Sequence, residues 1–187
     1  MANKDAAFGL KPIGKVGQNR DNQGLSEYSI AANDTAIYFH DPVQALGTGT
    51  VGVAAAGDTL LGSLNGIFYT DSTTKKPTWA NHLDASNAAT DIVGFVADDP
   101  YERFEIQSAG SVTGANIFLV ADIAYTAGDS ANYVSKTEIS GTMTSGASAQ
   151  LRIIGISKDP DNNDTSSANV NVVVNINEHV LNSANGI

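Results

Sequence analysis

The sequence predicts an all-β protein, an antiparallel β-sandwich or barrel-like domain preceded by an extended N-terminal arm. Three observations predict this class. Short apolar runs recur roughly every 8–12 residues, turn residues separate them, and no stretch keeps a helical period. Nothing repeats at a fixed longer spacing, which argues against a propeller or a solenoid. We therefore expect an arm over residues 1–27 and one β domain over residues 28–187.

The first 27 residues are rich in glycine and carry a charge opposite to that of the whole chain. Four glycines between positions 9 and 24, together with Pro12, interrupt any regular helix or strand period. Four basic residues and one acidic residue give the first twenty positions a net charge of +3, whereas the chain has a net charge of −10. We expect this arm to lie along the surface of another protein, and terminal disorder without a role is the alternative. The expected partner-binding residues are Lys4, Phe8, Leu10, Lys11, Ile13 and Lys15.

Residues 169–177 contain the clearest strand pattern. Val170, Val172, Val174 and Ile176 fall on one face of an extended chain, and asparagines occupy most positions between them. The segment 92–107 predicts two strands that pair as a hairpin around a turn at residues 98–100. We expect further strands at 28–32, 36–39, 43–53, 60–69, 117–123, 133–139 and 151–156, and either a short helical turn or a polar loop at 80–90.

Composition and charge exclude several classes of protein. The 187 residues include no cysteine, which excludes disulfides and thiolate metal sites and fits synthesis in a reducing cytoplasm. No apolar run approaches the ~18 residues that a transmembrane helix needs. The net charge of −10 argues against general nucleic-acid binding, because affinity for phosphates comes from clustered Lys and Arg. We expect a folded protein that binds neither nucleic acid nor a membrane.

The densest carboxylates lie beside a proline and do not predict catalysis. Asp98, Asp99, Glu102 and Glu105 surround Pro100, and general acid catalysis would require one of them to lie in a dry pocket. Charged side chains are rarely buried unless they are paired, so we expect a solvated turn.

The remaining sequence motifs predict no enzyme, metal site or cofactor. The loop after Asp159 begins like an EF-hand, but Asp164 stands where that loop needs glycine and Val170 where it needs a bidentate glutamate. The three histidines lack the spacing of a metal-binding pair, and neither a nucleophile elbow nor a phosphate-binding loop is present.

The single tryptophan suggests a contact patch. Trp79 follows Lys75, Lys76 and Pro77, and with Phe68 and Tyr69 it could contact a glycan or a base. The simpler interpretation is a packing residue, because aromatic side chains dominate core burial.

Four segments resemble the capsid decoration proteins of tailed bacteriophages, also called cement or head-stabilising proteins. They are the leader MANKDAAFGLKPIGKVG, the block GDTLLGSLNGIFYTDSTTKKPTW, the segment IVGFVADDPYERFEIQSAG and the closing NVNVVVNINEHVL. The resemblance implies a non-enzymatic, β-rich homotrimer on the outer surface of the virion, bound to the major capsid protein. It also implies that Lys4, Phe8, Lys11 and Lys15 lie at a junction between capsid subunits. The alternatives are a carbohydrate- or receptor-binding β module and a tail component of the virion.

Overall fold

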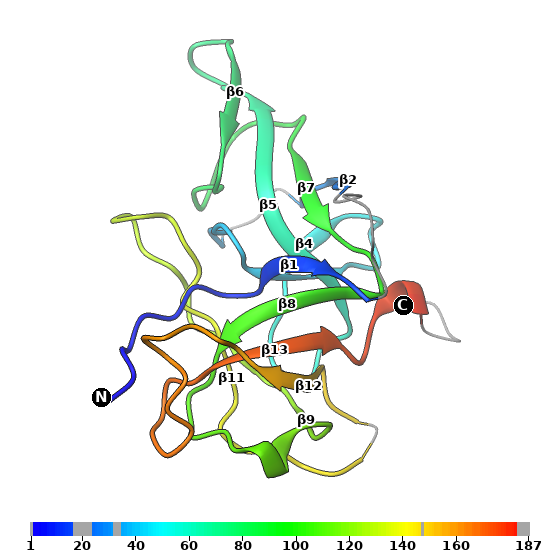
Figure 1. Ribbon diagram of the computed structural model, residues 1–187. Helices are drawn as coiled ribbons and strands as arrows, with labels where there is room; N and C mark the ends of the chain where they lie inside the picture. Colours follow the sequence, from blue (N-terminus) through cyan, green and yellow to red (C-terminus); the bar gives the residue numbers. More distant parts are fainter. Residues whose placement is uncertain (1, 17–23, 32–34, 147, 183–187) are drawn as a thin grey trace.

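The computed structural model describes residues 2–16, 24–31, 35–146 and 148–182 (Figure 1). This part of the chain forms thirteen short strands and two 3₁₀ turns, η1 (Gly114–Asn116) and η2 (Val180–Asn182). All strand pairs within it are antiparallel, and the sheets pack as a sandwich-like fold. The all-β prediction is confirmed. No helix in these residues is long and apolar enough to cross a membrane.

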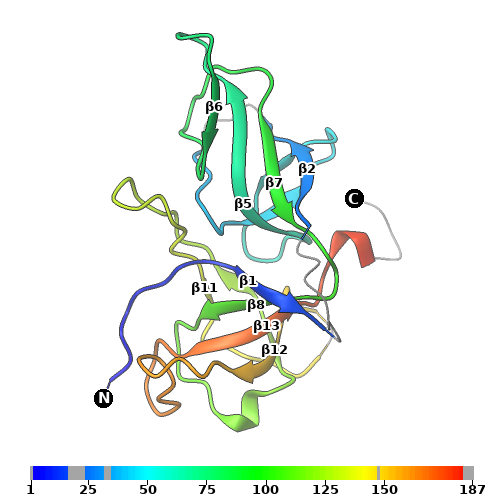
Figure 2. The same cartoon turned by 45° about the horizontal axis from the view of Figure 1, so that its top comes forward.

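The five-stranded sheet begins with part of the N-terminal leader. Its order is β1 (Lys11–Lys15), β8 (Glu102–Gln107), β13 (Asn171–Ile176), β12 (Leu151–Ile156) and β9 (Val120–Ala121). A separate two-stranded sheet pairs β10 (Ile123–Ala124) with β11 (Glu138–Ile139). Figures 1 and 2 place β1 at the edge of the five-stranded sheet that faces the other large sheet.

The six-stranded sheet is built around β5 (Leu60–Thr70), a strand of eleven residues. One edge of β5 pairs with β7 (Val93–Ala97), which in turn pairs with β2 (Ser26–Ser29). The other edge pairs first with β3 (Pro42–Ala45) and then with β6 (Pro77–Ala80), while β4 (Val51–Val53) extends the sheet beyond β3. Gly62 allows a close approach here, because a Cβ atom at this position would lie 2.1 Å from the carbonyl oxygen of Ala97.

Each large sheet packs over its own apolar cluster. The first cluster lies on the five-stranded sheet and includes Phe104, Leu151 and the alternating residues of β13 with Val170 before it. These alternating residues are at most 7% exposed, so the predicted face is confirmed. The second cluster lies on the six-stranded sheet and includes Leu64, Ile67 and Val96.

Gln150 is a fully buried polar residue that connects several segments. Its Nε2 donates hydrogen bonds to the carbonyl oxygens of Ala55 (2.8 Å) and Asp58 (2.7 Å), between β4 and β5. Its Oε1 accepts one from the Ile123 N–H at 3.0 Å, at the start of β10. One amide side chain thus satisfies three backbone groups.

Several predicted elements differ from those observed. The segment 92–107 does contain two strands, but β7 and β8 belong to different sheets, so the predicted hairpin pairing is wrong. The run 117–123 is interrupted and yields only β9 and the start of β10, and 133–139 yields only β11. Residues 60–69 form one strand as expected, with a bulge between Leu64 and Gly66, whereas the expected strand at 43–53 is divided into β3 and β4, which pair as a hairpin. Residues 80–90 beyond the end of β6 contain no helix.

Candidate attachment site

The leader forms part of the domain's own structure rather than standing apart from it. Within β1, Lys11 pairs with Glu105 and Lys15 with Glu102 on β8. Just before β1, Leu10 is fully buried in the first apolar cluster, and its N–H donates to the His40 carbonyl oxygen at 2.9 Å. The leader is extended as expected, but its described residues pack on the chain's own domain.

Polar side chains of the domain hold the residues that precede β1. Gln107 Oε1 accepts a hydrogen bond from the Ala6 N–H, and Gln107 Nε2 donates to the Lys4 carbonyl oxygen, both at 3.0 Å. Asn162 also donates to the Lys4 carbonyl oxygen, at 2.7 Å. Asn3 exchanges two hydrogen bonds with the Asp164 backbone, at 2.9 and 3.0 Å. The loop that resembled an EF-hand therefore anchors the leader.

Two basic side chains of the leader, those of Lys11 and Lys15, are paired within the same chain. Lys11 Nζ lies 3.3 Å from Glu105 Oε2, and Lys15 Nζ lies 2.7 Å from Asp99 Oδ2. The hydrogen bond between Lys15 and Asp99 raises the pKa of Lys15 and lowers the pKa of Asp99. The body's acidic residues thus attract the leader electrostatically.

Glu102 is an exception to the expected solvated turn. It is 3% exposed and accepts a hydrogen bond from the Gly14 N–H at 3.1 Å. Burial raises the pKa of Glu102, which this hydrogen bond and nearby Lys15 partly offset. The Glu102 carboxyl group thus satisfies a backbone N–H at the bulge of β1, which lies between Pro12 and Gly14.

The expected partner-binding residues therefore divide into three groups. Leu10 is wrong as a surface contact, because its side chain is fully buried in the chain's own core. Phe8 is half-buried with Lys11 Nζ 5.9 Å from its ring centroid, and Lys11 and Lys15 form the ion pairs above. Lys4 and Ile13 remain exposed, Ile13 at 42%. Arg20, the fourth basic residue of the expected arm, lies outside the described residues.

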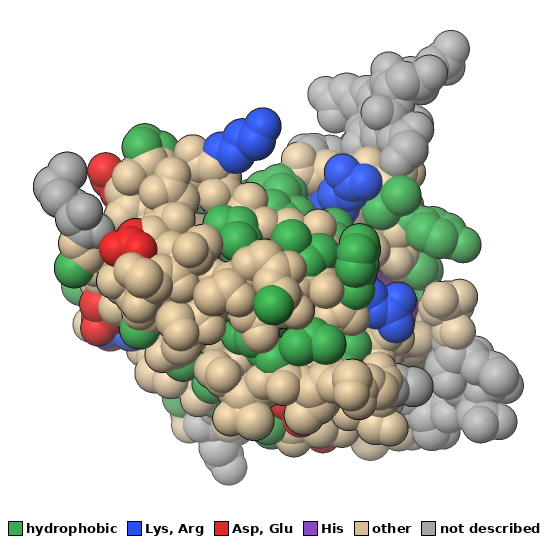
Figure 3. All heavy atoms as spheres, turned by 60° about the horizontal axis from the view of Figure 1, so that its bottom comes forward, with side chains coloured by type: hydrophobic (Ala, Val, Ile, Leu, Met, Phe, Trp, Pro, Cys, Tyr) green, Lys and Arg blue, Asp and Glu red, His purple; other side chains and the backbone are tan. Residues whose placement is uncertain are grey.

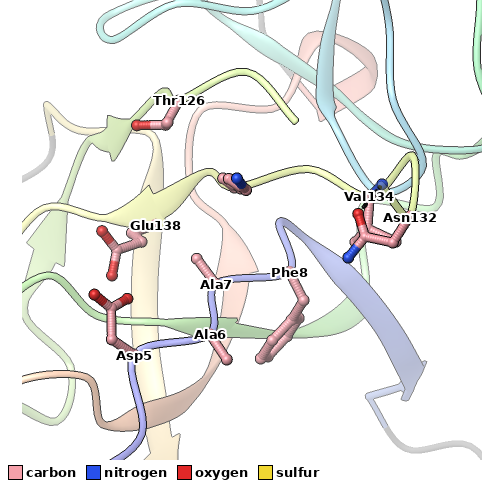
Figure 4. Close-up of a pocket in the computed structure, with 9 residues that line it drawn as sticks. Asp5, Ala6, Ala7, Phe8, Thr126, Asn132, Val134 and Glu138 are labelled. Atoms are coloured by element: carbon pink, nitrogen blue, oxygen red, sulfur yellow. Dashed lines mark hydrogen bonds between the residues drawn. The ribbon is translucent and has the colours of Figure 1, made fainter. Parts of the chain in front are cut away.

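A pocket of about 660 Å³ lies between the leader and the segment that contains β11 (Figure 4). Asp5 and Glu138 face each other across it in the close-up, and Phe8 lies farther along the same wall. Burial, together with the negative charge of Asp5, raises the pKa of Glu138. Nowhere among the described residues do three metal-ligating side chains of the types His, Asp and Glu gather into a candidate metal site.

Exposed apolar side chains from four separate segments gather where the leader ends. We call Val16, Leu25, Tyr101 and Leu181 the attachment surface; they are 45%, 44%, 64% and 55% exposed. Leu25, Tyr101 and Leu181 line one hollow of about 520 Å³, which is rimmed by Lys15, Asp98 and Asp99. Val16 adjoins it, because its N–H donates to the Tyr101 carbonyl oxygen at 2.9 Å. The sequence did not identify this surface, since its members are scattered singly along the chain.

The lone tryptophan is a surface residue. Trp79 is 69% exposed, so its interpretation as a core packing residue is wrong. Its ring lies 4.9 Å from that of Phe68 and 5.1 Å from that of Phe95, measured between centroids. We call Phe68, Trp79 and Phe95 the aromatic platform.

Two of the three histidines, His40 and His179, are largely withdrawn from solvent. Burial lowers the pKa of His40 to about 4 and lowers the pKa of His179. His82 stacks on Tyr133 with 3.7 Å between ring centroids. Beside His40, burial raises the pKa of Asp41 to about 6, which hydrogen bonds from Ser135 and Tyr38 partly offset.

Charge is distributed unevenly over the end of the molecule formed by the five-stranded sheet. Figure 3 shows acidic side chains on one side of this face, Lys and Arg on the other, and hydrophobic side chains between them.

Comparisons of the chain with protein-family models, curated proteins and solved structures gave no match.

Proposed function

We propose that the protein is a virion structural protein that binds the outer surface of a phage capsid. In this proposal it stabilises the shell by bridging major capsid protein subunits, acts as a homotrimer, and is made in the host cytoplasm. The observation that carries the proposal is the attachment surface, an apolar patch formed by four segments on an otherwise acidic body. Contiguous exposed apolar patches with a polar rim are typical of protein–protein contacts.

The leader has a positioning role in this proposal. Its ion pair between Lys15 and Asp99 lies at the rim of the hollow, and β1 brings Val16 against Tyr101. Lys4, Phe8, Leu10, Lys11 and Ile13 would then support the contact with the capsid through the docking of β1, with Lys4 and Ile13 available at the surface. The acidic remainder of the body would keep decorated particles soluble and mutually repelling.

Binding to capsids that lack the protein tests the proposal. Tyr101→Ser and Leu181→Ser each remove an exposed apolar side chain, and we expect at least about tenfold weaker co-sedimentation with capsids for each. Phe118→Ser is the matched control, because Phe118 is 75% exposed and lies beside η1 at the opposite edge of the five-stranded sheet. If Tyr101→Ser and Leu181→Ser bind capsids as tightly as Phe118→Ser does, the attachment surface does not contact the capsid.

Electron microscopy of particles with and without the protein tests its location and oligomeric state. Density of three copies on the outer shell is expected. Labelled protein on the tail would instead support the alternative of a tail component.

A second candidate function is carbohydrate binding. The observation that favours it is the aromatic platform, where an exposed tryptophan rests on two further aromatic rings.

A further inference from the structure

The aromatic platform lies on the face of the six-stranded sheet opposite its apolar cluster, because Phe68 follows Ile67, which belongs to that cluster, and successive residues of a strand point to opposite faces. The β5–β6 hairpin projects away from the rest of the molecule (Figures 1 and 2). Phe68 on β5 is directly opposite Trp79 on β6, and Phe95 on β7 is opposite Gly66. The planes of Trp79 and Phe95 differ by only 25°. One side of the indole therefore rests on the sheet, while its 69% exposure leaves the other side open to solvent.

Gly66 creates a hollow in this face. A Cβ atom at this position would meet nothing closer than 3.9 Å, where it would touch Phe95 Cδ2 and the Ala80 carbonyl oxygen. The missing side chain leaves a depression of about 410 Å³, lined by Leu25, Trp79, Phe95 and two asparagines. Its floor is apolar and aromatic, and its size suits one small ring.

The two asparagines offer complementary hydrogen-bonding groups to a ligand. Asn65 Nδ2 donates to the Ser63 carbonyl oxygen at 3.0 Å, which leaves Asn65 Oδ1 as an acceptor. Asn81 Oδ1 lies 2.9 Å from His82 Nδ1, which leaves Asn81 Nδ2 as a donor. Within the part of the chain that the structure describes, neither remaining amide atom has a hydrogen-bond partner. The hollow therefore combines an aromatic floor with one acceptor and one donor in its lining.

This combination matches the chemistry of a pyranose ring, which has an apolar C–H face and hydroxyl groups around its edge. A stacked nucleic-acid base would bring phosphates, and neither Lys75 nor Lys76 lines the hollow. Glu27 is directly opposite Phe95 on β2 and is exposed, so an anionic sugar would be repelled. We propose that the aromatic platform binds a neutral hexopyranose, with its C–H face on Trp79 and its hydroxyl groups bonded to Asn65 and Asn81.

The proposed sugar site rests on the second candidate function, carbohydrate binding, and names its ligand class. It uses different residues from capsid attachment, apart from Leu25 at the border of both surfaces. A single stacked ring gives weak affinity, in the millimolar range. Many copies on one particle would raise the effective affinity for a glycan-covered surface without any further contact.

Fluorescence tests this proposal directly, because Trp79 is the only tryptophan in the chain. We would titrate the full-length protein with methyl β-D-glucopyranoside, methyl β-D-galactopyranoside and N-acetylglucosamine up to about 50 mM, well above a millimolar dissociation constant. A saturable change in emission with at least one sugar is expected. No saturable change with any of the three would overturn the proposal.

Gly66→Val is the decisive variant, because it fills the hollow while Trp79 stays in place. We expect at least about tenfold weaker sugar binding in this variant, with β-sheet circular dichroism unchanged. Binding equal to that of the wild type would overturn the proposal. If Gly66→Val does not fold, Asn81→Ala takes its place, and the same weakening is expected.

Two controls separate sugar binding from other roles of this face. Tyr101→Ser should weaken capsid binding and leave sugar binding unchanged. Gly66→Val should weaken sugar binding and leave capsid binding unchanged. Either proposal can therefore be refuted without affecting the other. Sedimentation of Trp79→Ala provides the other control. If the wild type forms an oligomer that this variant cannot form, the face is an interface between copies, and the sugar proposal is overturned.

Discussion

Replacing Leu10 with alanine should destabilise the whole domain, although the sequence places this residue in a glycine-rich leader. The side chain is fully buried in the first apolar cluster, alongside the core of the five-stranded sheet. Truncation of a buried leucine to alanine costs about 2–5 kcal/mol, because it removes apolar burial and leaves a cavity. For a chain of this size that loss lowers the melting temperature by about 4–20 °C.

Ile13→Ala is the matched comparison, because Ile13 lies in β1 only three residues after Leu10. Ile13 is 42% exposed, so its truncation removes much less buried area and should cost only about 1 kcal/mol. Urea unfolding followed by circular dichroism gives both free energies of unfolding. If Leu10→Ala costs no more than Ile13→Ala, the leader is not part of the core, and our reasoning about its docking is wrong. A deletion of residues 2–16 should likewise destabilise the fold, rather than leave it intact as a detachable arm would.

Three further predictions concern buried groups elsewhere in the fold. Gly62→Ala places a methyl group against the Ala97 carbonyl oxygen, at an unrelaxed distance of 2.1 Å, and should lower the melting temperature by at least several degrees; an unchanged melting curve would contradict the close approach. Gln150→Leu leaves the Asp58 carbonyl oxygen and the Ile123 N–H without their partner, because the Ala55 carbonyl oxygen still accepts a hydrogen bond from the Asp58 N–H, and it should cost at least about 2 kcal/mol in urea unfolding, with a near-zero loss as the contradicting result. The folded-state pKa of Asp41 is raised to about 6 from 3.8, so its contribution to stability is present below the lower value and is lost as pH rises through the higher one. Asp41→Asn should therefore stabilise the protein by up to about 3 kcal/mol near pH 8 and little near pH 3.5. An equal gain in stability at both pH values would refute the raised pKa of Asp41. His40, whose folded-state pKa is lowered to about 4, changes stability with pH in the opposite sense, and it does so equally in the wild type and in the variant.

Local patterns in the sequence were enough to predict the class of fold and its most regular strand. The alternation around β13 predicts which side chains are buried, because a strand with one covered face has a period of two residues. The turn at residues 98–100 is likewise placed correctly. A turn signal marks where a strand ends but does not say which strand it pairs with, and here the chain passes from one sheet to the other.

The role of the leader could not be predicted because its contacts are distant in sequence. Glycines and unbalanced charge suggest a free arm, whereas Gln107 and Asn162 hold it through its backbone. The attachment surface escaped prediction for the same reason. Trp79 shows a different limit, since the pattern around β6 does not reveal that its side chain lies on the surface.

The pairing of β1 with β8 has a consequence for the order of events during synthesis. The leader is translated before β8, which is made about ninety residues later, and Asp164 in the loop that holds Asn3 lies 161 residues further along the chain. The leader can therefore complete its contacts only after the segment around Asp164 has also been translated. Until the cluster around it has been made, Leu10 has no native cover, and such exposed apolar surface promotes premature association.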